Sequence, residues 1–155
     1  YRQEIPFMFP EDSDVRTVKT AFFDPFEFLF ARYKDGLVKT DFVEPLGVVA
    51  YHAACHQRVQ NIGQRTREFL SLVPDTEVSI IERCSGHDCT YAVKKETHEA
   101  ALKIARPVIR QVTEANASTY GSDCPMAGRL IQHGKNDGSQ SEHPITMLSR
   151  AYGLG

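Results

Sequence analysis

The chain has 155 residues, of which 41% are hydrophobic and 25% charged, the mixture of one globular domain with its own core. The net charge is −2 and the basic residues are scattered, which argues against a nucleic-acid-binding surface. No apolar run approaches a membrane span and no signal peptide opens the chain, so we expect no direct membrane insertion. Four cysteines without a secretory signal indicate a reducing, cytoplasmic location, where contact with the inner membrane surface would require partners.

The first 46 residues predict helices and no strands. Asp12 or Ser13 caps a first helix, and Asp24-Pro25 begins a second that ends at Gly36. Aromatic and aliphatic side chains recur at helical spacing in both, which is typical of core packing. We therefore treat residues 1–46 as a helical N-terminal segment of the same domain and expect it to pack across a sheet.

Residues 47–155 alternate between strand and helix patterns. Strands are predicted at residues 47–55, 77–83 and 118–123, and helices at residues 56–73, 93–115, 125–133 and 144–152. Val59 and Ile104 are among the side chains expected on the buried faces of two of these helices. This alternation predicts an α/β core with a parallel sheet flanked by helices.

Three cysteines fall where the predicted strands end: Cys55, Cys84 and Cys124. In an open α/β sheet, ligands bind beyond the carboxyl ends of the strands, so these distant residues are expected at one edge. Thiolates that converge there would suit a soft metal or an iron–sulfur cluster. Each cysteine taken alone is also compatible with a small buried apolar residue.

Two residues near Cys84 extend this candidate site. Cys89 is a further thiol that would serve as a ligand, as a resolving thiol or as an ordinary helix-start residue. His87 shares the loop of Cys84 and is the best candidate for a nitrogen ligand or proton donor, whereas His52 suits the core or a supporting role equally well. The sequence contains no G-x-S-x-G elbow, phosphate-binding loop or dinucleotide fingerprint, so it assigns no catalytic residue.

Three stretches in this order, YHAACHQRVQNIGQRT, IERCSGHDCTYAVKKE and SDCPMAGRLIQ, resemble the cysteine-rich CCG domain. That domain occurs in iron–sulfur oxidoreductases such as the B-subunit of heterodisulfide reductase and the C-subunit of anaerobic glycerol-3-phosphate dehydrogenase. The resemblance is closest to the C-terminal part of the latter type. It implies that Cys55, Cys84 and Cys124 are cluster ligands.

The sequence departs from the family pattern at two of its five thiols. Ser85 replaces the second cysteine of the Cys-Cys-Gly motif that ends in Gly86, and Ala127 stands where the last cysteine is expected. Three thiolates would then hold a cluster, of the 4Fe-4S type, with one iron open or completed by His87, Cys89 or a residue outside this chain. The resemblance also implies an upstream ferredoxin-like domain, which agrees with the abrupt start without an initiator Met.

The leading hypothesis is an iron–sulfur electron-transfer domain of an oxidoreductase, with a redox partner protein or a flavoprotein subunit. The alternatives are a structural zinc-binding domain held by the same cysteines, and a metal-free subunit-interaction module. Whether the chain has an enzymatic activity of its own is left open at this point.

Overall fold

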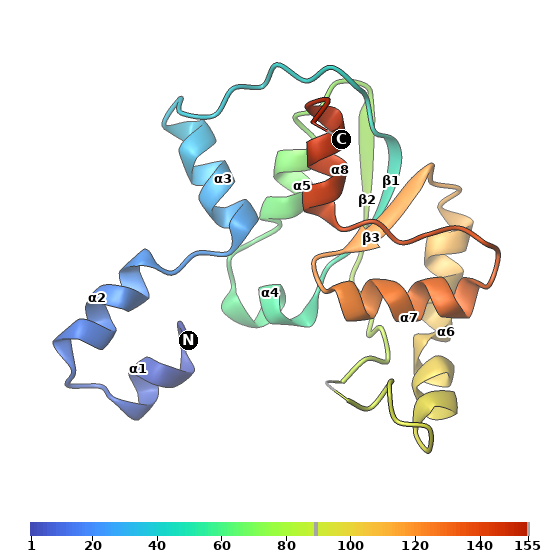
Figure 1. The fold of residues 1–155 in the computed structure, drawn as a ribbon, viewed down its shortest axis with the longest axis horizontal. Helices are drawn as coiled ribbons and strands as arrows, with labels where there is room; N and C mark the ends of the chain where they lie inside the picture. Colours follow the sequence, from blue (N-terminus) through green and yellow to red (C-terminus); the bar gives the residue numbers. More distant parts are fainter. Residues whose placement is uncertain (89, 155) are drawn as a thin grey trace.

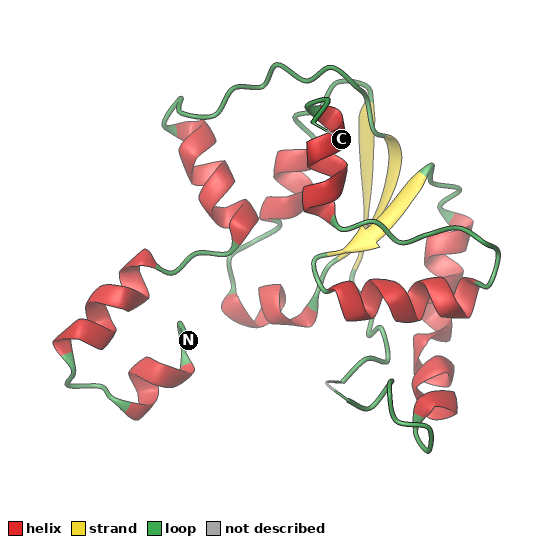
Figure 2. Cartoon of the chain, in the orientation of Figure 1, coloured by secondary structure: helices red, strands yellow, loops and turns green. Residues whose placement is uncertain are grey.

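In the computed structural model, which describes residues 1–88 and 90–154, a parallel sheet lies between two groups of helices (Figures 1 and 2). The strand order is β2-β1-β3, so the first strand in sequence is central. The strands are β1 (Gly47–His52), β2 (Thr76–Ile81) and β3 (Thr119–Ser122). The predicted α/β class with a parallel sheet is therefore confirmed.

One face of the sheet is covered by helices α3 (Pro25–Lys34), α5 (Arg65–Leu70) and α8 (Pro144–Ala151) (Figure 1). Val49 and Tyr51 of β1 point to this face and join a cluster with Phe26, Phe69 and Met147. Successive strand residues point to opposite faces, so alternate residues of β1 supply this core. Of the N-terminal segment, α3 joins this layer, where Phe26 packs on Phe69 of α5.

The other face is covered by α6 (His98–Glu114) and α7 (Pro125–Lys135). Small side chains of α6, including the fully buried Ala101 and Ala105, let this helix pack against Ala50 of β1. Helices α6 and α7 also approach each other closely at Gly134, where an added Cβ would lie 2.2 Å from Ile109 Cδ1. These small residues fix the distance between the helices and the sheet.

The N-terminal helices α1 (Glu4–Met8) and α2 (Ser13–Ala21) lie apart from these layers (Figure 1). Neither helix has a buried residue, and Phe7 and Met8 are 87% and 65% exposed. The expected packing across the sheet is therefore wrong for this part of the segment. We define residues 1–23 as the N-terminal arm.

Two sequence expectations about helices in the core are also wrong. The helix predicted over residues 56–73 is divided into α4 (Cys55–Gln60) and α5, because Asn61 and Gly63 have φ values of 53° and 79°. Val59 is consequently 67% exposed, and Ile104 is 46% exposed on the outer side of α6. Among the described residues, no helix has both the length and the apolar character needed to cross a membrane.

Candidate functional site

The three strands end level with one another. The last residue of β1, His52, pairs with Ile81 of β2 and with Ser122 of β3. Three cysteines follow these ends with one or two residues in between: Cys55, Cys84 and Cys124. The strands are shorter than predicted, but the loops after them still leave the same edge of the sheet. The structure thus places the three cysteines at the carboxyl edge, which includes α4 and the loop between β2 and α6.

Cys55 is the first residue of α4 and its side chain is exposed. The guanidinium of Arg58 donates a hydrogen bond to its Sγ at 3.4 Å. A surface hollow of about 290 Å³ lies beside it, between α4 and the first residues of the N-terminal arm. Cys55 is therefore accessible from the surface of the domain.

Cys84 is exposed in the loop that follows β2, and its Sγ accepts a hydrogen bond from the Gly86 amide at 3.4 Å. Gly86 has a φ of 76°, and a Cβ there would lie 2.2 Å from the carbonyl oxygen of Ala101. Only glycine allows this close contact, so the loop packs directly on the first turns of α6. The neighbouring His87 has a buried Nδ1 that finds no hydrogen-bond partner among residues 1–88 and 90–154.

Cys124 is half-buried and occupies the N-cap position of α7, directly before Pro125. Its backbone N–H donates to Ser122 Oγ at 3.2 Å. Cys89, the fourth thiol of the sequence, lies outside the described residues.

Two positions where the family resemblance expects cysteines are filled by buried residues. Ser85 is 4% exposed and Ala127 is 3% exposed. Ser85 Oγ accepts a hydrogen bond of 3.4 Å from the His87 amide. Both residues therefore have structural contacts in the fold without contributing a thiol.

A buried histidine connects two of the cysteine-bearing loops. His52 is 1% exposed, with Nε2 at 2.8 Å from the carbonyl oxygen of Arg83 and Nδ1 at 2.9 Å from Ser122 Oγ. A carbonyl oxygen only accepts, so Nε2 carries the proton and Nδ1 accepts from the serine hydroxyl. Burial is the main cause that lowers the pKa of His52 and keeps the ring neutral.

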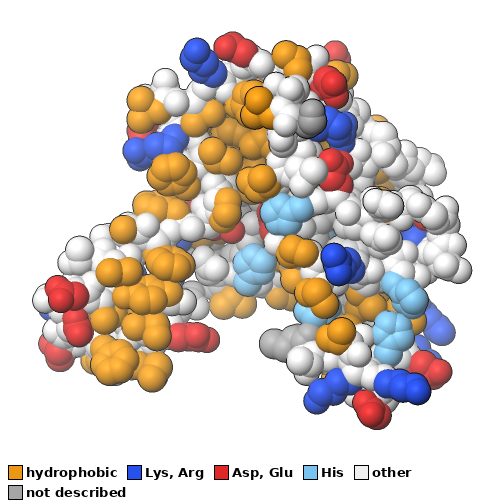
Figure 3. Space-filling model, viewed as in Figure 1, with side chains coloured by type: hydrophobic (Ala, Val, Ile, Leu, Met, Phe, Trp, Pro, Cys, Tyr) orange, Lys and Arg blue, Asp and Glu red, His pale blue; other side chains and the backbone are white. Residues whose placement is uncertain are grey.

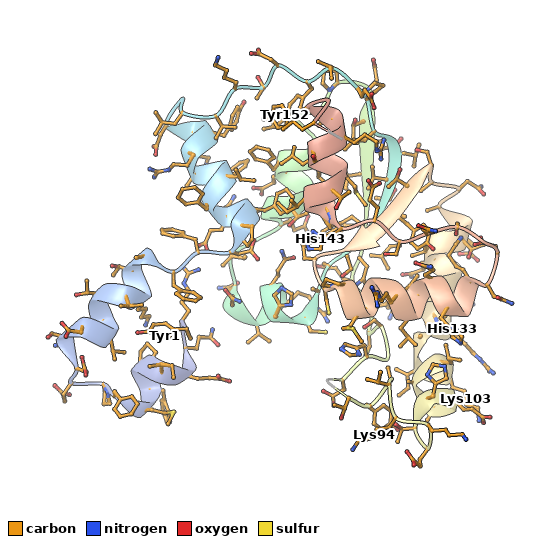
Figure 4. The ribbon with its side chains drawn as sticks, viewed as in Figure 1. Tyr1, Lys94, Lys103, His133, His143 and Tyr152 are labelled. Carbon is orange, nitrogen blue, oxygen red and sulfur yellow. The ribbon has the colours of Figure 1, made fainter. Side chains whose placement is uncertain are left out.

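A second buried network lies on the opposite face of β1. The Tyr51 hydroxyl lies 2.6 Å from Gln57 Oε1 and also contacts the carboxyl group of Asp123. Thr66 Oγ1 lies 3.1 Å from Asp123 Oδ2, and His143 Nε2 at the start of α8 lies 3.2 Å from the Asp123 carbonyl oxygen (Figure 4). Burial is the main cause that raises the pKa of both Tyr51 and Asp123.

The sequence does not predict this second network. The sequence pattern around Tyr51 indicates only a strand, and Asp123 is far from Tyr51 in sequence. A signal did exist, because an aspartate directly between a strand and a helix-capping cysteine stands at the ligand-binding edge of a parallel sheet. Nothing in the sequence pattern pairs that aspartate with Tyr51.

A metal ion or an iron–sulfur cluster requires several suitable donor atoms close together. Three thiols and an imidazole nitrogen that lacks a partner within the described part of the chain have the right chemistry for iron–sulfur or zinc ligation. Within residues 1–88 and 90–154, however, no three His, Cys, Asp or Glu side chains converge closely enough to hold a metal ion. The donors fit in kind and in location, but they do not form a closed ligand set.

A parallel sheet with a cysteine after each of its three strands defines a cysteine-bearing α/β domain. Comparison with known proteins then identifies a particular relative. The chain is a distant homologue of the C-subunit of the anaerobic glycerol-3-phosphate dehydrogenase of Escherichia coli K12, with 33% identity over 108 residues. The matched region covers 69% of this chain and 26% of the E. coli protein.

The C-subunit of the same dehydrogenase from Escherichia coli O157:H7 matches with the same identity and coverage. The chain therefore spans about a quarter of the length of the curated relatives it matches. No protein-family model matches the chain, and no solved structure gives a significant match. The resemblance to the C-subunit of this dehydrogenase is thus confirmed as a homology to an oxidoreductase subunit.

Proposed function

We propose that this chain is an iron–sulfur electron-transfer domain of an oxidoreductase subunit. One observation carries the proposal: the register of the sheet brings the cysteine-bearing ends of all three strands to one edge. The homology to a dehydrogenase subunit supports a redox role for these thiols. A bound cluster would supply one-electron redox chemistry there.

Each donor has a defined task in this proposal. Cys55, Cys84 and Cys124 are the thiolate ligands, with Arg58 beside the first and the start of α7 directly after the last. His87 is the candidate fourth ligand, because its buried Nδ1 has no hydrogen-bond partner among the described residues and such a nitrogen is costly unless it binds something. Cys89 remains a second candidate for the same position.

The partners belong to the same proposal. Two exposed thiols place the site at the surface, where a cluster would exchange electrons with a redox partner protein or a flavoprotein subunit. An upstream ferredoxin-like domain of a longer parent chain would supply the next cluster in the path. We propose a cytoplasmic location, with contact to the inner membrane surface through partners alone.

The test is an anaerobic preparation in which iron, acid-labile sulfide and zinc are quantified together with a visible spectrum. We expect iron and sulfide in near-equal amounts and broad absorption that Cys84→Ser abolishes. Val93→Ser is the matched control, because Val93 is a 62% exposed residue of the same loop without a ligating atom. Iron in both wild type and Cys84→Ser would remove Cys84 from the ligand set.

Zinc as the sole metal would replace the redox role with a structural site, and chelators would then destabilise the fold. Absence of every metal would favour the third reading, a metal-free subunit-interaction module. A specific observation supports that reading: apolar side chains gather on the N-terminal arm (lower left in Figure 3), which has no buried residue in α1 or α2. Exposed apolar surface of this kind commonly marks a protein contact.

A further inference from the structure

The last two residues of the central strand contact segments on both sides of it. Tyr51 and His52 are each 1% exposed, and they point to opposite faces of the sheet because they are consecutive in a strand. Strand β1 has β2 on one side and β3 on the other. Side chains at its carboxyl end can therefore reach the loops that follow all three strands.

His52 joins the loops of Cys84 and Cys124. Its Nε2 donates to the carbonyl oxygen of Arg83, the residue directly before Cys84, at 2.8 Å. Its Nδ1 accepts from Ser122 Oγ at 2.9 Å, and the same oxygen accepts from the Cys124 amide at 3.2 Å. Each of these three hydrogen bonds has one donor and one acceptor, so they are all formed by the tautomer of His52 that carries its proton on Nε2.

Tyr51 joins the segments of Cys55 and Cys124 on the other face. Its hydroxyl lies 2.6 Å from Oε1 of Gln57, a residue of the helix that begins at Cys55. The same hydroxyl contacts the carboxyl group of Asp123, the residue directly before Cys124. Gln57 Nε2 and Thr66 Oγ1, which are 3.1 Å apart, tie this contact to α5.

We infer that Tyr51 and His52 are positioning residues that hold the three cysteine-bearing segments in a fixed arrangement at the carboxyl edge. The inference rests on the proposed function, because a bound cluster would be the common ligand of the three thiols. Each of these partners of Tyr51 and His52 lies within two residues of a cysteine, so the pair acts on the backbone that carries the thiols. Buried networks of this kind restrict local opening.

The test measures alkylation of each cysteine by iodoacetamide, followed by mass spectrometry, in the reduced, metal-free full chain. Cys124 is the reporter, because it is half-buried whereas Cys55 and Cys84 are exposed. We expect Tyr51→Phe and His52→Ala each to raise the Cys124 rate about fivefold, the value of one net hydrogen bond. His52→Gln, which keeps an amide nitrogen for Arg83, should lie between His52→Ala and the wild type.

Ser118→Ala is the matched control. Ser118 Oγ bonds to the carbonyl oxygens of Leu46 and Val48 at the opposite edge of the sheet, so this variant also loses a hydrogen-bonding hydroxyl near β1. We expect its Cys124 rate to match the wild type. Gln57→Met is a second test of the Tyr51 contact that leaves Asp123 intact, and it covers the case in which Tyr51→Phe fails to fold.

The outcomes separate this inference from the proposed function. Cys124 rates in Tyr51→Phe, Gln57→Met and His52→Ala that equal the rate in Ser118→Ala would overturn the inference, even in a protein that binds a cluster. A rise at Cys124 that scales with the loss in free energy of unfolding would also overturn it, because general loosening of the fold predicts that pattern. Selective exposure of Cys124 in a chain that takes up no metal would support the positioning role and count against the electron-transfer role.

Discussion

Helices α2 and α3 are neighbours in sequence and begin in the same way, yet their environments differ. Asp12 accepts hydrogen bonds from two amides of α2, and Asp24 accepts from two amides of α3. Helix α2 has no buried residue, whereas α3 buries Phe26 against the sheet face. A capping aspartate thus determines where each helix begins, while packing determines which helix contributes to the stability of the domain.

The largest expected effect comes from deleting the buried aromatic ring of α3. Phe26→Ala should lower the free energy of unfolding by about 3–5 kcal/mol, because Phe26 is 1% exposed and packs edge-to-face on Phe69. Phe7→Ala in the N-terminal arm should change it by less than about 0.5 kcal/mol. Urea denaturation measures both. Equal losses would show that the arm is part of the cooperative core.

Removing the capping aspartate of α2 or of α3 should give a smaller difference in the free energy of unfolding. Asp24→Ala should cost about 1–2 kcal/mol, because Asp24 forms a capping box with Glu27 in the helix that packs on the core. Asp12→Ala should leave global unfolding unchanged and reduce only the helical circular dichroism signal of the arm. A large global loss in Asp12→Ala would contradict the separation of α2 from the core.

The network that links α3 to the sheet also predicts a pH dependence. Gln57 Nε2 lies 3.5 Å from Asp24 Oδ2, and Tyr51 and Thr66 connect Gln57 to Asp123. Asp123 is half-buried, and desolvation is the main cause that raises its pKa above 3.8. A carboxyl group with a raised native pKa binds its proton more tightly in the folded state. The contribution of Asp123 to the free energy of unfolding is therefore present below pH 3.8 and is lost as the pH rises through the native pKa.

Asp123→Asn should remove this loss, because asparagine does not titrate. The free energy of unfolding of the wild type minus that of the variant should therefore fall as the pH rises from 3.8. Asp137→Asn is the control with the opposite sign. The hydroxyl of Ser139 is the main cause that lowers the pKa of Asp137 to about 2, so its contribution is lost as the pH falls from 3.8 toward 2. Urea titrations between pH 2 and 6 distinguish the two; parallel curves would refute the assignment.

The smallest effect concerns the ion pair between the arm and α3. Arg2 Nη1 lies 2.5 Å from Glu27 Oε2, with both side chains partly exposed. Arg2→Ala should cost at most about 1 kcal/mol in global stability, since such pairs are screened by solvent. Limited proteolysis should nevertheless cleave residues 1–23 faster. Unchanged cleavage would mean that this pair does not restrain the arm.

Local patterns in the sequence predicted much of the fold. Pro25, Pro125 and Pro144 each stand at a first helical turn, as predicted from their fixed φ angle. The division between α4 and α5 was missed, because Asn61 adopts a positive φ that an asparagine takes up only in some contexts. The exposure of Ile104 was missed because helical spacing indicates a face but not how far the covering layer extends.

The candidate site was predictable in one respect. The gathering of Cys55, Cys84 and Cys124 at one edge follows from the topology of a parallel sheet. The contact of Tyr51 with Asp123 was not predictable, since it depends on a tertiary distance between residues far apart in sequence. The ligand role of the cysteines and of His87 remains a prediction.

The level strand ends have a consequence for tolerance to insertions and deletions. One or two residues separate each strand end from its cysteine, so the cysteine Cα can lie no more than about 7–11 Å from the last Cα of the strand. Connections this short have little slack to absorb a change in length. Loss of Ala53 or Ala54 would draw Cys55 back by one residue while its two counterparts stay in place. A survey of single-residue deletions should therefore find these connections intolerant, and the open loop at residues 137–141 permissive.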